Sequence, residues 1–183
     1  MSLEKNYLSL NVSDSDKNLQ YWLAQPYVNE DLATQIKRAD VLVLPWEDFR
    51  PDEPVLFPNG STDFYRRLAI AVGSERVTLV ATPDLYREIA LHANVWRFPA
   101  LFVTVVALPI LVNVISSEID SRLHHKDDKV ELNLVVSAAN HHCVQIDYKG
   151  PADGAVEKLA DAAMRYCGVD VSKGRAHGHA KHK

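Results

Sequence analysis

The sequence predicts an α/β fold: a small, mostly parallel sheet with flanking helices, followed by a C-terminal β-hairpin and an amphipathic helix. Two observations predict it. In the N-terminal half, short aliphatic runs alternate with stretches of helical periodicity, which is typical of a sheet whose strands are joined by helices. After residue 128 the pattern changes to two alternating strands at hairpin spacing and then a single amphipathic helix.

The first elements are a strand, two helices and a buried strand. Residues 7–12 alternate apolar and polar side chains, as a half-buried strand does. Residues 16–24 place apolar side chains on one helical face, and residues 29–39 repeat this pattern with Asn29 as the N-cap. The run ADVLVLPW over residues 39–46 holds four consecutive aliphatic residues and is ended by a proline, which indicates a strand buried on both faces.

The same alternation continues through the middle of the chain. A proline-rich loop leads into a helix over residues 61–72, with Ser61 or Thr62 as its N-cap and a glycine after its last turn. RVTLVATP, residues 76–83, is another short apolar strand. The proline and acid at its end predict a further helix over residues 83–93.

The most apolar part of the chain raises the question of a membrane segment. Residues 98–117 carry no charged side chain, and a helix of that length would span a bilayer core. Pro99 and Pro109 argue against this, because each removes a backbone hydrogen bond that lipid does not replace. An apolar stripe opposite serine and asparagine side chains predicts instead an amphipathic helix of a water-soluble protein; it consists of Leu108, Leu111, Val112, Ile115 and Ile119.

Three interpretations of the apolar, proline-containing segment 98–123 follow, in our order of preference. The segment is buried in the core of a soluble fold, it is a docking surface for a partner or a second copy, or it is a membrane segment. In the second interpretation the five residues of the stripe form the interface. Within the segment, LFVTVVA at residues 101–107 is either a buried strand or the first turns of a kinked helix.

The length of 183 residues fits one domain with a tail. Residues 1–171 are the predicted single α/β domain, which ends in the hairpin and helix of residues 129–167. Residues 172–183, SKGRAHGHAKHK, are predicted to be a disordered, basic, His-rich tail. The tail contributes four positive charges to a net charge of −4, so residues 1–171 carry −8. An acidic body argues against nucleic acid as a partner.

Cysteine, histidine and glycine usage excludes several kinds of site. Cys143 and Cys167 make neither a disulfide framework nor a metal-ligand spacing, so we expect reduced thiols. The chain has no Gly-rich phosphate loop, no nucleophile elbow and no His-Glu-x-x-His motif, so no cofactor and no metal are expected. The N-terminus does not resemble a signal peptide, which favours a cytoplasmic location, with membrane association as the alternative.

The loop and helix start over residues 46–67 are the best candidate for a ligand site. In open α/β sheets ligands bind at the carboxyl ends of strands, where this loop begins. The start of the helix offers N–H groups to an anion, and two arginines follow one turn later. The alternative is that these residues bind no ligand: a hydroxyl side chain caps the helix, and the arginines are solvated. The candidate residues are Trp46, Asp48, Ser61, Thr62, Asp63, Arg66 and Arg67.

The segments ADVLVLPWEDF and NGSTDFYRRLAIAVG, about a fifth of the chain, resemble the strand, loop and helix unit of the nucleoside deoxyribosyltransferase-like enzymes. The resemblance implies cleavage of N-glycosidic bonds and a nucleophilic Glu on the helix after a Gly-Thr type turn. The matching place in this chain, residues 64–66, holds Tyr65 and no acid. This departure removes the group on which the reaction depends, so the sequence leans away from an enzyme.

The predicted function is therefore a non-enzymatic interaction or regulatory module, such as an adaptor, that acts through protein–protein contacts or self-association. The order of its elements is similar to that of adaptor domains that accompany effectors in bacterial conflict systems. One alternative is nucleotide-like ligand binding, or N-glycosidic bond hydrolysis, at the 46–67 loop. Another is a membrane-associated effector that acts through residues 98–117. The sequence identifies no catalytic residue and names neither the ligand nor the partner.

Overall fold

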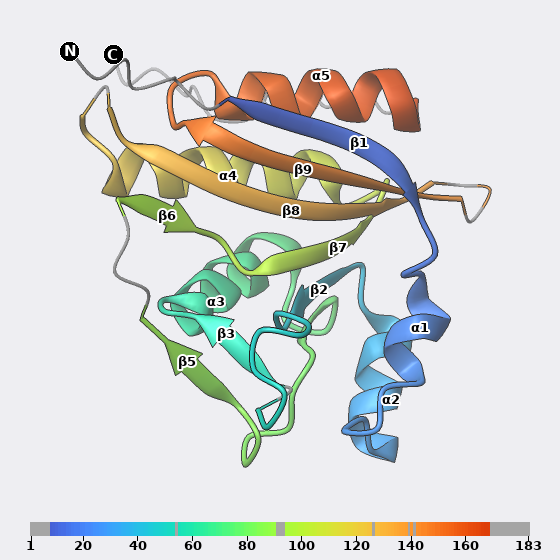
Figure 1. Cartoon of the computed structure of the whole chain (residues 1–183). Coiled ribbons are helices and arrows are strands. Elements are labelled where there is room, and N and C mark those ends of the chain that lie inside the picture. The colour runs from blue at the N-terminus through green and yellow to red at the C-terminus, as the bar shows by residue number, and fades with distance from the viewer. Residues whose placement is uncertain are drawn as a thin grey trace, which may run out of the picture.

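The computed structural model describes residues 8–53, 55–90, 94–125, 127–138, 140 and 142–168. Seven strands form one sheet in the order β1-β9-β8-β7-β2-β4, and β6 also pairs with β8 (Figure 1). These strands are β1 (Ser9–Ser15), β2 (Val41–Leu44), β4 (Val77–Leu79), β6 (Val95–Arg97), β7 (Ala100–Thr104), β8 (Lys129–Ser137) and β9 (Cys143–Pro151). A second, two-stranded parallel sheet joins β3 (Leu56–Pro58) to β5 (Arg87–Ile89).

The described helices pack on opposite faces of the large sheet. Two of them, α1 (Leu19–Leu23) and α2 (Glu30–Arg38), form a core with one face, which includes Trp22, Ile36, Leu42, Leu44 and Phe102. The other three form a larger core with the opposite face: α3 (Ser61–Val72), α4 (Leu108–Arg122) and α5 (Ala155–Cys167). Figure 1 shows α4 behind the long strands β8 and β9 and α5 above them at the top of the view, with α1 and α2 beside β2.

The α/β class is confirmed, together with the C-terminal hairpin and the helix that closes it. The sheet is larger and more mixed than the predicted one. β2–β4, β7–β8 and β6–β8 are parallel, whereas β2–β7, β8–β9 and β1–β9 are antiparallel. The hairpin does not form a separate layer, because β8 pairs with β7 and places Leu134 beside Leu101. Strand β1 then extends the same sheet beyond β9.

The apolar segment 98–123 lies at the centre of the fold. Its first part is β7, between β2 and β8, and its second part is α4, with Pro109 in the first turn. All five residues of the predicted stripe are buried in the larger core: Leu108, Leu111, Val112, Ile115 and Ile119. The segment is therefore core, and these side chains present no docking surface in the chain as described. Among the described residues, no helix combines the length and the apolar character that crossing a bilayer requires.

One predicted helix is wrong over its described part, residues 83–90. Residues 87–89 form β5, which runs parallel to β3. The aromatic ring of Tyr86 packs against Phe57 of β3, with 4.8 Å between the ring centroids. This pairing with a distant segment overrides the local helix signal of a proline followed by an acid. The remainder of the prediction, residues 91–93, lies outside the described residues.

Helix α4 also buries an acid. Glu118 is 1% exposed, and its carboxylate accepts a hydrogen bond from Arg67 of α3 at 2.6 Å. Arg122, one turn further along α4, donates to the other carboxylate oxygen. The guanidinium of Arg122 lies over the ring of Trp96, 4.7 Å from its centroid. The two arginines thus neutralise the buried acid and tie α3, α4 and β6 together.

Some expectations fall on residues that the structure does not describe. The basic tail of residues 172–183 is one of them, so its predicted disorder stays a prediction. Within the described ranges, no three or more His, Cys, Asp or Glu side chains come together as a metal-binding group. Neither Cys143, which is buried, nor Cys167, which is half-buried, forms a disulfide.

Candidate functional site

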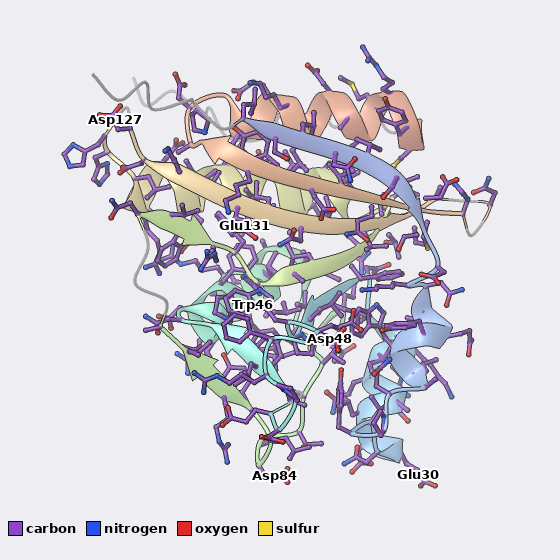
Figure 2. All side chains as sticks on the ribbon, viewed as in Figure 1. Glu30, Trp46, Asp48, Asp84, Asp127 and Glu131 are labelled. Atoms are coloured by element: carbon purple, nitrogen blue, oxygen red, sulfur yellow. The ribbon has the colours of Figure 1, made fainter. Side chains whose placement is uncertain are left out.

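A crevice of about 630 Å³ opens between α2 and α3, where the chain leaves β4. This volume is in the range of small-molecule sites. Figure 2 shows Asp84 and Glu30, the first residue of α2, at the same end of the molecule. Among the polar and aromatic side chains that line the crevice are Asp31, Gln35, Thr62, Tyr65, Asp84 and Tyr86.

The order of the elements explains why these residues meet. Helix α2 precedes β2 and packs on one face of the sheet, whereas α3 follows β2 and packs on the other. A helix that leads into a strand, and a helix that leaves it, both begin at the carboxyl edge of that strand. Because β2 and β4 are parallel, the N-termini of α2 and α3 flank the end of β4. The sheet thereby places two helix starts and one loop around a single crevice.

The start of α3 is capped by an acid from another strand. Gly60 is the N-cap residue, with a left-handed φ of 89°, and no side chain of its own segment caps the helix. Instead, the carboxylate of Glu88 in β5 accepts hydrogen bonds from the N–H groups of Gly60 and Thr62, each at 3.0 Å. The hydroxyl of Tyr86 donates to the same carboxylate at 2.5 Å. The predicted cap, Ser61 or Thr62, is therefore wrong: the Ser61 hydroxyl donates to the carbonyl of Pro58 at 2.6 Å.

These contacts set the ionisation of the two side chains. Burial alone would raise the pKa of Glu88, but hydrogen bonds from Tyr86, Thr62 and Gly60 together lower it below its usual value. Burial, followed by the hydrogen bond to Glu88, raises the pKa of Tyr86. Near neutral pH Glu88 is thus a carboxylate and Tyr86 a phenol. Three donors hold the carboxylate, so it acts as a cap and is poorly placed to act as a nucleophile.

The crevice has an acidic character. Asp31 and Asp84 both line it, and none of its described lining residues is Lys, Arg or His. A hydrogen bond from Thr82 is the main reason why the pKa of Asp84 lies below its usual value. With Glu88 already at the N-terminus of α3, the anion site expected at that helix is occupied from within the chain. The crevice therefore favours neutral or cationic groups over phosphate.

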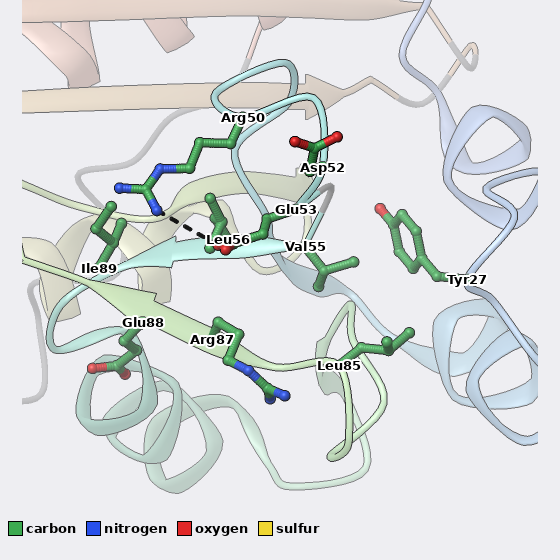
Figure 3. A pocket seen from close by; sticks show the side chains of 10 residues that line it. All are labelled: Tyr27, Arg50, Asp52, Glu53, Val55, Leu56, Leu85, Arg87, Glu88 and Ile89. Atoms are coloured by element: carbon green, nitrogen blue, oxygen red, sulfur yellow. Dashed lines mark ion pairs between the residues drawn. The ribbon is translucent and has the colours of Figure 1, made fainter.

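A second cavity, of about 530 Å³, lies beside the small β3–β5 sheet (Figure 3). Tyr27, Arg50, Leu56 and Arg87 are among its lining residues. The Arg50 guanidinium is 3.8 Å from the Glu53 carboxylate, and the Arg87 guanidinium donates to two backbone carbonyls of its own loop. Both arginines therefore already have partners. In Figure 3 Glu88 extends from β5 toward α3, away from Arg50.

The residues predicted as a ligand site do not converge. Only Thr62 lines the crevice, where its hydroxyl lies 2.9 Å from that of Tyr86. Asp63 and Arg66 form an exposed ion pair at 3.2 Å on the outer face of α3. Ser61 is buried at the start of the helix, and Arg67 points to Glu118 on the side of α4. The helical periodicity thus directs consecutive side chains to different surroundings.

Trp46 and Asp48 belong to the loop between β2 and β3. The N–H group of Trp46 donates to the carbonyl of Leu56 at 2.8 Å, and its ring packs against Phe49 with centroids 5.2 Å apart. Asp48 is exposed and has a φ of 56°, in the left-handed region that aspartate tolerates better than most residues. Figure 2 shows both residues well above Asp84. Neither residue lines the crevice between α2 and α3.

Sequence reasoning missed most of the residues that do line the crevice. Asp31 and Gln35 lie on a helix that the sequence identified only by its apolar face and its cap. Asp84 and Tyr86 lie in the segment predicted as a helix, so their approach to α3 was not foreseen. One signal was available: the residues around Thr82–Asp84 follow an apolar strand, at the edge of the sheet where ligands bind in α/β folds.

The comparisons with known proteins found no match to a protein-family model, to a curated protein or to a solved structure.

Proposed function

We propose that this chain is a non-enzymatic binding module that holds a small, uncharged, nucleoside-like ligand in the crevice between α2 and α3. The observation that carries the proposal is the convergence of acids, hydroxyls, amides and two tyrosines around one cavity of about 630 Å³. A few directed polar groups in a concave site are the usual basis of small-molecule recognition.

The lining matches a flat ring that carries hydroxyl groups. Tyr65 and Tyr86 offer aromatic surface to a planar ring. The carboxylates of Asp31 and Asp84 accept hydrogen bonds from ligand hydroxyl or amino groups, and Gln35 can donate as well as accept. The Thr62 hydroxyl donates to Tyr86, so it can only accept from a ligand. A phosphate would meet two carboxylates and no described cation there. These features support a nucleoside-like ligand over its phosphorylated form.

Binding is favoured over bond cleavage for one reason. The resemblance to deoxyribosyltransferase-like enzymes implies a nucleophilic acid near the start of this helix. Of the two acids near that start, Asp63 lies outside the crevice, and Glu88 is held by two backbone N–H groups and the Tyr86 hydroxyl. A carboxylate stabilised in this way is a weak nucleophile and a poor proton donor near neutral pH. A regulatory role, with the ligand as signal, is consistent with such a site.

The proposal is tested by calorimetry with adenosine, guanosine, cytidine and uridine, each compared with its 5′-monophosphate. We expect at least one nucleoside to bind more tightly than its monophosphate. Asp84→Asn should then weaken binding by about 10- to 100-fold, because a hydrogen bond to a charged group is worth about 1.5–3 kcal/mol.

Asp63→Asn is the matched control, because Asp63 is an exposed carboxylate near the start of the same helix but outside the crevice. It should leave the affinity unchanged. If none of the eight compounds binds, or if Asp63→Asn and Asp84→Asn weaken binding equally, the crevice is not the site.

A further inference from the structure

The sheet ends in a long strand with an open edge. β1 pairs with β9 over seven residues, and among the described residues no strand lies along its other side. Figure 1 shows β1, in blue, as the outermost strand beside β9. Alternate residues of such a strand direct their N–H and C=O groups outward, where they can accept another strand. The opposite end of the sheet is β4, which has only three residues.

The side chains of β1 alternate in character. Leu10 and Val12 lie opposite Tyr148 and Ile146 of β9, on the face that carries α4 and α5. Leu10 is nevertheless 43% exposed, and Leu8, just before the strand, is 48% exposed. The intervening residues, Ser9, Asn11 and Ser13, are exposed on the other face. Leu8 and Leu10 therefore form an exposed apolar strip along the outer strand, and no described residue covers this strip.

The edge lacks the devices that usually prevent strand pairing. Natural edge strands are protected by lysines, prolines, bulges or very short length. Residues 8–13, LSLNVS, contain no charged residue and no proline, and their pairing with β9 is regular. The first charge of β1 is Asp14, whose carboxylate lies 2.9 Å from the ring of His142. An unprotected edge of this kind is suited to receive a strand.

We propose that two copies of the chain associate through antiparallel pairing of β1 with β1, with the two-fold axis at Leu10. In this register Leu10 lies opposite the partner's Leu10, Leu8 opposite the partner's Val12, and Ser9 opposite the partner's Asn11. Apolar side chains then meet apolar ones on one face and polar side chains meet polar ones on the other, as a two-fold interface requires.

The neighbouring registers are less favourable. Moving the axis to Asn11 places Asp14 opposite the partner's Leu8. A shift of a single residue sets apolar side chains against polar ones along the whole strand. The register at Leu10 is thus favoured over both of these alternatives. The result is one continuous sheet through both copies, independent of the crevice between α2 and α3.

The association is tested by sedimentation velocity over a concentration range up to about 200 μM, which detects dimers with dissociation constants in the micromolar range. We expect a concentration-dependent dimer for the unmodified chain. Leu10→Lys should give a monomer, because two ammonium groups would face each other at the axis. Ile70→Lys is the control: Ile70 is 86% exposed on α3, and a charge there should leave the dimer intact.

A chain that remains monomeric throughout this range, or a Leu10→Lys variant that still dimerises, overturns the proposal. Unchanged far-UV circular dichroism establishes that the variant is folded, as the exposure of Leu10 leads us to expect.

Cross-linking tests the register independently. Residues directly opposite each other in an antiparallel pair have Cα atoms about 4.5–5.5 Å apart, within reach of a disulfide. In a Cys167→Ser background, Leu10→Cys should be converted to a covalent dimer by diamide, whereas Ile70→Cys should form no covalent dimer. Equal cross-linking of the two variants, or none at position 10, contradicts pairing at Leu10.

Discussion

At the residue scale, the carboxylate of Glu88 replaces the capping side chain that α3 lacks. Its hydrogen bonds stabilise the charged form, so its pKa in the folded chain lies below the ordinary value of 4.5. The folded state then binds fewer protons than the unfolded state. Glu88 therefore contributes stability that is fully present above pH 4.5 and is lost as the pH falls through the lower, folded pKa.

We expect Glu88→Gln to remove this contribution. Above pH 5 the variant should be less stable than the unmodified chain by about 1 kcal/mol, the usual worth of a helix cap, and the difference should shrink as the pH falls toward 3. Urea unfolding at a series of pH values measures it. Glu75→Gln, at an exposed position in the turn after α3, serves as the control. Parallel pH profiles for the unmodified chain and Glu88→Gln would contradict this role.

For the ion pairs of Glu118, we predict that removing the two arginines costs more stability than removing the acid. Its carboxylate is 1% exposed, whereas the side chains of its partners Arg67 and Arg122 are 47% and 31% exposed. Replacing both arginines by methionine leaves a buried charge without its described ion-pair partners and should cost about 3–5 kcal/mol. Glu118→Gln leaves two guanidinium groups that water can reach, so it should cost clearly less. Chemical denaturation measures the loss of stability in both variants, and equal losses would contradict this asymmetry.

At the scale of the elements, predictions succeeded where the signal was local. The start of α2 is an example: the Asn29 side chain accepts a hydrogen bond from the N–H group of Leu32, and two acids follow in the first turn. The two strands of the hairpin and the apolar stripe of α4 were likewise predicted from patterns of neighbouring residues. β5 was missed because its stability comes from β3, about thirty residues earlier in the chain.

The candidate site was mostly beyond the reach of sequence reasoning for the same reason. Thr62 was identified because a helix start is visible in the sequence. Asp31, Asp84 and Tyr86 come together only through the parallel pairing of β2 with β4 and the turn into β5. No regular spacing of residues in the sequence indicates that these three side chains lie close together. The burial of Glu118 was equally invisible, since its two arginine partners come from one turn later in α4 and from α3.

Substitution of a buried residue tests whether α4 belongs to the core. Leu111 is fully buried against the sheet, so Leu111→Ala should lower the free energy of unfolding by about 2–5 kcal/mol through lost transfer energy and a residual cavity. Val106→Ala, at a position largely exposed just before the same helix, should change it by less than about 0.5 kcal/mol. Urea unfolding measures both. If Leu111→Ala reduced self-association without reducing stability, the helix would be an interface.

At the scale of the whole molecule, one sheet serves two cores. Val41 and Val43 of β2 face the α3–α4–α5 side, whereas Leu42 and Leu44 face α1 and α2, and all four are buried. β7 and β8 alternate in the same way. If one core lost its packing, one face of the strands would become exposed. The opposite face of the same strands forms part of the other core, which would be weakened as well. The two cores should therefore unfold as a single cooperative unit.

Tryptophan fluorescence tests this cooperativity directly. Trp22 is buried in the α1–α2 core, and Trp96 packs against the other core. A variant that retains only Trp22, with phenylalanine at positions 46 and 96, reports on the first core, and one that retains only Trp96 reports on the second. We expect the fluorescence transition of each variant in urea to coincide with its own far-UV circular dichroism transition. A Trp22 transition at lower urea than the circular dichroism transition would mean that α1 and α2 detach first, and the crevice between α2 and α3 would then open before the sheet unfolds.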